Sequence, residues 1–105
     1  MKVLCTCENG NSRSVALAYI LKRQYGFDAL AMGLHVSMPQ TKDMLFDWAD
    51  QVVLTDATLI GEIPNRVLGK LKIYDVGEDR YFKGFKRELL DQFRQYLEND
   101  PLELA

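Results

Sequence analysis

Short apolar runs that fit β-strands alternate along this chain with stretches whose apolar residues recur at helical spacing. The strand-like runs cover residues 2–6, 27–32, 51–56 and 71–76, and the third of them is rich in β-branched residues. A helical pattern begins at Arg13 and should stop at Gly26, and a second, shorter helix should start at Pro39. This alternation constrains the fold more than any other feature of the sequence.

The second half of the chain is less regular. Residues 57–60 fit a short helix, and Pro64 should break the pattern that follows. From Gly84 to about Glu98 a long amphipathic helix is predicted, and the tail from Asn99 should fray. Its apolar face carries Phe85, Leu89, Leu90, Phe93 and Leu97.

Strands that alternate with helices predict right-handed crossovers and a parallel sheet. We therefore expect a three-layer α/β fold, in which a four-stranded parallel sheet has helices on both faces. The 105 residues suffice for one domain that spans residues 1–105. In such sheets ligands bind at the carboxyl ends of the strands.

Charge and sequence pattern argue against several classes of function. The net charge of −2 argues against a dedicated nucleic-acid binder, and no apolar stretch is long enough to span a membrane. No secretory signal follows Met1, so we expect a cytoplasmic protein. The two cysteines, Cys5 and Cys7, are too poorly spaced for an ordinary disulfide, and with His35 as the one histidine a zinc site lacks ligands.

The turn between the first strand and the first helix carries the chemistry. Its small residues let backbone N–H groups point inward, and the helix that follows adds its positive end, which together make a cradle for a dianion. Cys7 lies at the mouth of this cradle, where the same field favours a thiolate. Arg13, six positions later, could bind two phosphoryl oxygens with its planar fork, and Ser14 could donate a hydrogen bond to the thiolate.

Cys-(any five)-Arg-Ser directly after the first strand resembles the signature of low-molecular-weight protein tyrosine phosphatases, and more closely that of shorter predicted protein tyrosine phosphatases. The segments 48–50 and 75–79 also resemble that group. The chain departs from the pattern at Gly10, where the family usually has asparagine, and at Val15, where it often has proline. The resemblance implies the flavodoxin-like sheet of this family and a phosphatase that uses a cysteine nucleophile.

The resemblance also implies a general acid just past the last strand, where Asp75 and Asp79 both fit. Tyr81 and Phe82 could wall the pocket and stack on an aromatic substrate. The loop residues expected around the phosphate are Glu8, Asn9, Gly10, Asn11, Ser12 and Ser14.

The implied reaction is hydrolysis of a phosphomonoester, with phosphotyrosine as the expected substrate. The Cys7 thiolate attacks phosphorus, the aspartate protonates the leaving oxygen, and water then hydrolyses the phosphocysteine. No metal or other cofactor is required. The expected partner is a phosphorylated protein or a small phosphate ester.

Three other functions remain open at this stage. The loop is also similar to that of IIB phosphocarriers of the sugar phosphotransferase system, although these usually have a small hydroxyl residue at the position of Arg13. A binding module could hold a phosphorylated ligand without turnover. An arsenate reductase would need further cysteines, and none follows Cys7.

Overall fold

A computed structural model describes residues 1–78 and 86–102 of the chain. Its strands are β1 (Lys2–Cys7), β2 (Asp28–Gly33), β3 (Gln51–Leu54) and β4 (Leu71–Ile73), and its α-helices are α1 (Arg13–Tyr25), α2 (Pro39–Trp48) and α3 (Arg87–Asn99). Two 3-10 helices, η1 (Ala57–Glu62) and η2 (Asn65–Lys70), lie between β3 and β4.

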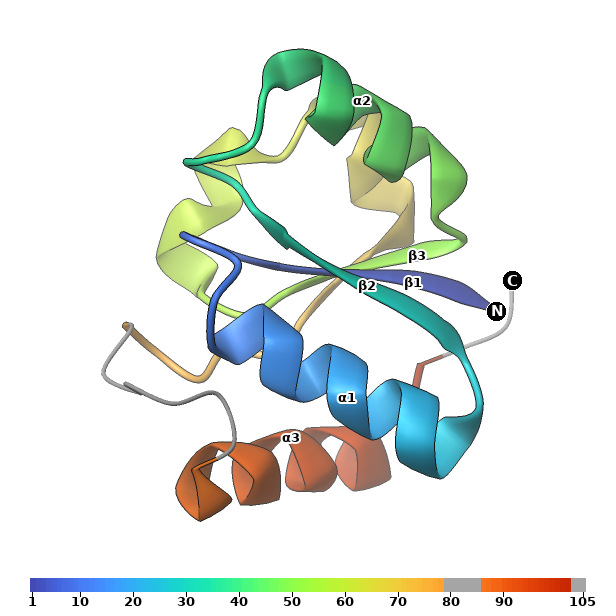
Figure 1. Cartoon of the computed structure of the whole chain (residues 1–105), viewed down its shortest axis with the longest axis vertical. Coiled ribbons are helices and arrows are strands. Elements are labelled where there is room, and N and C mark those ends of the chain that lie inside the picture. Colours follow the sequence, from blue (N-terminus) through green and yellow to red (C-terminus); the bar gives the residue numbers. More distant parts are fainter. Residues whose placement is uncertain (79–85, 103–105) are drawn as a thin grey trace.

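The four strands form a parallel sheet in the order β2-β1-β3-β4. Helices α1 and α3 cover one face, while α2 and the two 3-10 helices cover the other (Figure 1). The predicted three-layer α/β fold is therefore confirmed. Because β1 lies between β2 and β3, the carboxyl end of β1 is next to the ends of two other strands.

Successive side chains along each strand point to opposite faces of the sheet and belong to two apolar clusters, one on each face. Val3 and Cys5 of β1 join the cluster under α1 and α3, and Leu4 joins the cluster under α2, η1 and η2. This two-sided burial explains why the strands read as continuous apolar runs. Within the described residues, no helix combines the length and apolarity needed to cross a bilayer.

The element boundaries differ from expectation in the second half of the chain. The short helix predicted over residues 57–60 is present as η1, which extends to Glu62. Pro64 separates η1 from η2, as its predicted break requires, and occupies the N-cap position of η2. β4 ends at Ile73 and not at residue 76, although Tyr74 and Val76 still donate backbone hydrogen bonds to Leu54 and Thr55.

Helix α3 begins at Arg87, three residues later than predicted. Lys86 has an extended backbone, with ψ of 134°, and therefore cannot belong to the helix. The opposite end agrees better with the periodicity, since the helix ends at Asn99, one residue beyond the predicted Glu98.

Candidate active site

Cys7 is the last residue of β1, and its thiol is held at the start of the loop that leads to α1. The Gly10 N–H donates a hydrogen bond to Cys7 Sγ over 3.1 Å, and Ser14 Oγ lies 3.1 Å from the same sulfur. The side chain is 1% exposed. The sulfur is therefore held in a fixed position by a backbone N–H and a hydroxyl, beside the N-terminus of α1. The predicted contact between Cys7 and Ser14 is thus present in the structure.

The loop of residues 8–12 is braced by backbone contacts with the end of β2. Gly10 has a φ of 72°, and a Cβ there would lie 2.6 Å from the backbone nitrogen of Gly33. A Cβ at Gly33 would in turn lie 2.4 Å from the carbonyl carbon of Asn9. Both positions therefore require glycine, because the two backbones approach more closely than any side chain allows.

Two further hydrogen bonds join this loop to the chain after β2. Leu34 donates its backbone N–H to the Cys7 carbonyl over 2.8 Å, and His35 donates to the Glu8 carbonyl over 2.9 Å. The His35 ring also lies 3.3 Å from a Glu8 carboxylate oxygen and contacts Glu62. The loop is thus fixed by neighbouring backbone and is preorganised to hold a ligand.

Arg13 is the first residue of α1 and is 0% exposed. Its Nη1 donates to Asp56 Oδ2 over 2.9 Å and to the Gly77 carbonyl over 2.8 Å. Its Nε and Nη2 are buried and have no hydrogen-bond partner among the described residues. Buried guanidinium donors without partners are costly, so these two nitrogens indicate a position where a ligand anion would bind.

Asp56 lies two residues after the end of β3 and is 4% exposed. Its Oδ1 accepts hydrogen bonds from the Thr58 N–H over 3.0 Å and from the Thr58 hydroxyl over 2.6 Å. Burial by itself raises the pKa of this carboxyl, but the hydrogen bonds from Thr58 and Arg13 outweigh it and hold the pKa below its ordinary value. Asp56 is therefore charged and compensates the buried Arg13.

Asp56 is a site residue that no local sequence motif predicts. One signal could have found it, because Asp56 follows a strand that is parallel to β1. The carboxyl ends of parallel strands meet at one edge of the sheet, and that edge also holds Cys7. The contact itself joins residues 43 positions apart, which no local motif reveals.

The other predicted phosphate-binding residues differ in burial. Ser12 and Ser14 are buried at the start of α1, whereas Asn9 and Asn11 are exposed and Glu8 is partly exposed. These exposed side chains point to solvent, whereas the Gly10 N–H contacts the Cys7 sulfur and the Arg13 guanidinium is buried. This pattern is typical of a loop that binds an anion through its charge.

Asp75 lies in the turn after β4, where its side chain is exposed. Its Oδ1 accepts hydrogen bonds from the Gly77 N–H over 3.0 Å and from the Ala57 N–H over 3.3 Å. Because the Gly77 carbonyl accepts from Arg13, Asp75 braces the turn that holds the guanidinium. Asp79, Tyr81 and Phe82 lie outside the described residues.

Cys5 is separated from this chemistry. It is a free thiol, fully buried in the apolar cluster beneath α1, and burial raises its pKa, with a smaller contribution in the same direction from Cys7. A neutral, buried thiol is a poor nucleophile. We interpret Cys5 as a packing residue.

Comparison with known proteins identifies the architecture. No protein-family model and no curated protein matches the chain. Among solved structures, it is similar to the YwlE arginine phosphatase from Geobacillus stearothermophilus, with a TM-score of 0.61 and 16% sequence identity over 99% of this chain and 97% of that one. The two proteins share a fold along almost their whole length.

Proposed function

We propose that the chain is a cysteine-dependent phosphatase that hydrolyses phosphomonoesters through a phosphocysteine intermediate. The observation that carries this proposal is Arg13 at the start of α1, whose Nε and Nη2 are buried and find no hydrogen-bond partner in the part of the chain that the structure describes. A phosphoryl group can satisfy both donors at once, because two of its oxygens match the planar fork of a guanidinium. The shared fold with an arginine phosphatase supports the same reading.

The reaction begins with attack of the Cys7 thiolate on phosphorus. The Gly10 N–H and the Ser14 hydroxyl stabilise the anionic sulfur before the attack. As the S–P bond forms and the P–O bond breaks, Arg13 and the loop N–H groups stabilise the charge on the equatorial oxygens. A general acid protonates the leaving oxygen, and water then attacks phosphorus, which breaks the S–P bond and releases phosphate.

Asp75 and Asp79 are the two candidates for this acid, and the contacts of Asp75 allow a sharp test of its role. In the Asp75→Asn variant, the amide oxygen can still accept the hydrogen bonds from Ala57 and Gly77, whereas Asp75→Ala removes them. If Asp75 only braces the turn, Asp75→Asn retains activity and Asp75→Ala loses it. If Asp75 is the acid, both variants lose activity, most strongly with a poor leaving group such as phenyl phosphate.

The first experiment is hydrolysis of para-nitrophenyl phosphate in mildly acidic buffer. Cys7→Ser should abolish turnover, and Arg13→Lys should reduce kcat by about 10²-fold or more, because it removes the two-pronged contact with the transition state. Cys5→Ala is the matched control, since it removes the neighbouring thiol outside the loop and should retain activity. A folded wild type without turnover would overturn the proposal.

Substrate class is tested with a panel at equal concentration. Phosphotyrosine is the expected substrate, and phosphoarginine joins the panel because the structural neighbour is an arginine phosphatase. A stable phosphocysteine that transfers its phosphoryl group and is not hydrolysed would indicate the carrier function. Reversible phosphate binding without any turnover would indicate a binding module.

A further inference from the structure

The edge of the sheet at β2 is open and apolar. β2 is an outermost strand of the sheet, and its outer side pairs with no strand in the described part of the chain. Leu30 is 41% exposed, Ala31 is also exposed, and the one charged residue of the strand is Asp28, at its start. Edge strands are usually protected by lysine, proline or a bulge, and β2 has none of these protections.

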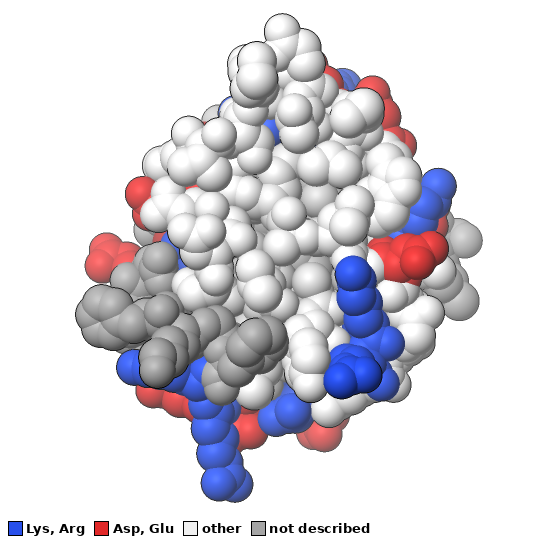
Figure 2. Space-filling model, viewed as in Figure 1, with Lys and Arg blue, Asp and Glu red and all other residues white. Residues whose placement is uncertain are grey.

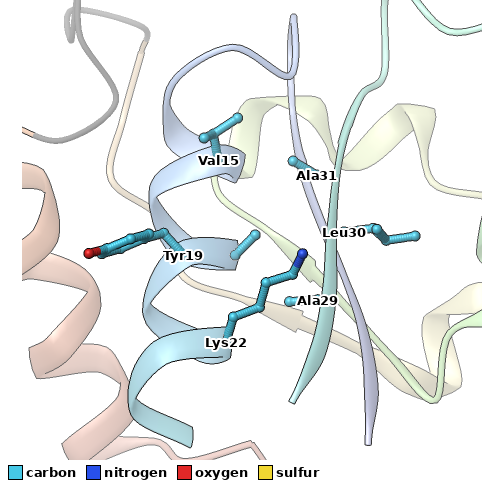
Figure 3. A pocket seen from close by; sticks show the side chains of 7 residues that line it. Val15, Tyr19, Lys22, Ala29, Leu30 and Ala31 are labelled. Carbon is cyan, nitrogen blue, oxygen red and sulfur yellow. The ribbon is translucent and has the colours of Figure 1, made fainter. Parts of the chain in front are cut away.

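A shallow groove of about 300 Å³ runs between this strand and α1. In Figure 3 its floor is formed by the small side chains of Ala29 and Ala31, and Lys22 extends from α1 toward the strand. Val15, Ala18 and Tyr19 of α1 complete the wall. Figure 2 shows that charged side chains are largely absent from the central part of this face and lie mainly around its margin. The groove therefore suits an extended apolar segment.

One end of the groove lies near the candidate active site, since Ala31 and Val15 in its lining are two residues from Gly33 and from Arg13. β2 ends at Gly33, which pairs with Cys7, and Leu34 donates a hydrogen bond to the Cys7 carbonyl. On the other wall, Val15 lies two residues after Arg13. A chain seated along β2 would thus have one end beside the phosphate-binding loop and the other beside Lys22.

We propose that this edge binds the polypeptide segment next to the phosphorylated residue of a protein substrate, which adds to the sheet as an antiparallel strand. The inference rests on the proposed function and specifies its substrate class. Antiparallel pairing is the more stable arrangement for an added strand, and it directs the segment from the active site toward Lys22 in the N-to-C direction. The bound segment is therefore C-terminal to the phosphorylated residue.

The geometry also predicts where the bound peptide should carry an acidic residue. Val15 and Lys22 are seven residues apart on α1, which corresponds to about 10 Å at ~1.5 Å per residue. An extended chain covers that length in about three residues, at ~3.3 Å each. We expect an acidic side chain three or four positions after the phosphorylated residue, where it meets the Lys22 ammonium, and small or β-branched apolar residues between them.

Binding to the Cys7→Ser protein tests this docking independently of turnover. The probes are fluorescent phosphotyrosine peptides that continue with Val-Thr-Val-Glu or with Val-Thr-Val-Lys. The Glu peptide should bind about three- to fivefold more tightly, as expected for one exposed ion pair, and adding Lys22→Glu should reverse the preference. Adding Arg87→Glu, the same charge change on α3, should leave the preference intact.

A second test of the docking proposal blocks the groove with a bulky side chain. Ala31→Tyr, added to the same protein, should reduce the affinity for both peptides to that for phosphotyrosine alone. In the otherwise wild-type chain, Lys22→Glu and Ala31→Tyr should leave hydrolysis of para-nitrophenyl phosphate unchanged within about twofold, because that small ester does not reach the groove.

Several outcomes would overturn the inference. Equal affinity for the two peptides would do so, as would a preference for the Glu peptide that survives Lys22→Glu. A wild-type dimer that Ala31→Tyr dissociates would also contradict it, because the β2 edge would then bind a second copy of the chain. Absence of turnover with para-nitrophenyl phosphate would instead contradict the proposed function, while the binding measurements would still decide whether the groove docks a peptide.

Discussion

At the scale of single residues, the site depends on how one buried positive charge is compensated. The Arg13 side chain is 0% exposed and that of Asp56 is 6% exposed, and their nitrogen and oxygen are 2.9 Å apart. Removing one partner of a buried ion pair leaves an uncompensated charge, which costs far more than the pair itself contributes.

Asp56→Ala should therefore lower the free energy of unfolding by about 3–5 kcal/mol. Asp56→Asn should cost less, because the amide oxygen can still accept from Arg13. Urea denaturation of both variants measures the difference. Equal stability of wild type and Asp56→Ala would contradict the assignment of Asp56 as the partner of Arg13.

Protonation of the Asp56 carboxylate should also contribute to unfolding in acid. Since the hydrogen bonds from Thr58 and Arg13 hold the pKa of folded Asp56 below its ordinary value of 3.8, the unfolded chain binds more protons than the folded chain in that range. This contribution to stability is complete above about pH 4 and is lost as the pH falls through the lower folded pKa. Stability measured against pH should decline there more steeply for wild type than for Asp56→Asn, and parallel curves would refute the assignment.

Local sequence could predict some of these residues and not others. Cys7, Arg13 and Ser14 lie in one loop, so their spacing already indicates that they act together. The contact of Arg13 with Asp56 joins α1 to the end of β3, and its contact with Gly77 joins residues 64 positions apart. Such contacts depend on strand order, which periodicity alone does not specify.

At the scale of elements, the loop between β1 and α1 is shaped by the neighbouring strand. Gly10 and Gly33 are in backbone contact, and the Gly10 N–H donates to the Cys7 sulfur. The geometry of the nucleophile therefore depends on a close approach between two elements that are adjacent in the sheet.

Gly10→Ala should strongly reduce activity, because its Cβ would lie 2.6 Å from the Gly33 backbone and must displace the loop. Gly26→Ala is the matched control. Gly26 also has a positive φ, of 68°, but no atom lies within 4 Å of the added Cβ. The control should lose only about 1 kcal/mol of stability from backbone strain and keep its kcat. Equal kcat losses in the two variants would argue against the role of the close contact.

Elements with a strong period were predicted well, whereas the segment between β3 and β4 was predicted only in part, as one short helix and a break at Pro64. The start of α1 at Arg13 and that of α2 at Pro39 agree with the apolar spacing and with the terminal residues. The two 3-10 helices between β3 and β4 are too short to show a period, and their conformation follows from packing Leu59, Ile63 and Val67 against the sheet.

At the scale of the whole molecule, the sheet separates two apolar clusters. Ile20 belongs to the cluster under α1 and α3, and Ile63 to the one under α2, η1 and η2. The two side chains belong to different clusters, because the sheet lies between them.

Ile20→Val and Ile63→Val should each lower the free energy of unfolding by about 0.5–1.5 kcal/mol. In the double variant the two losses should add within about 0.5 kcal/mol, because distant sites without shared partners are independent. Guanidinium denaturation of the four proteins completes the cycle. A large coupling energy would mean that the two faces of the sheet do not pack independently.

The most direct test of the central claim is detection of a phosphoryl group on Cys7 during turnover. The wild type is mixed with para-nitrophenyl phosphate, quenched in acid within the first turnover and mapped by mass spectrometry, while released phosphate is measured in parallel. We predict a transient phosphoryl group on Cys7, absent in Cys7→Ser, together with many equivalents of free phosphate. Steady turnover without phosphorylated Cys7, or a phosphocysteine that persists without releasing phosphate, would contradict the account.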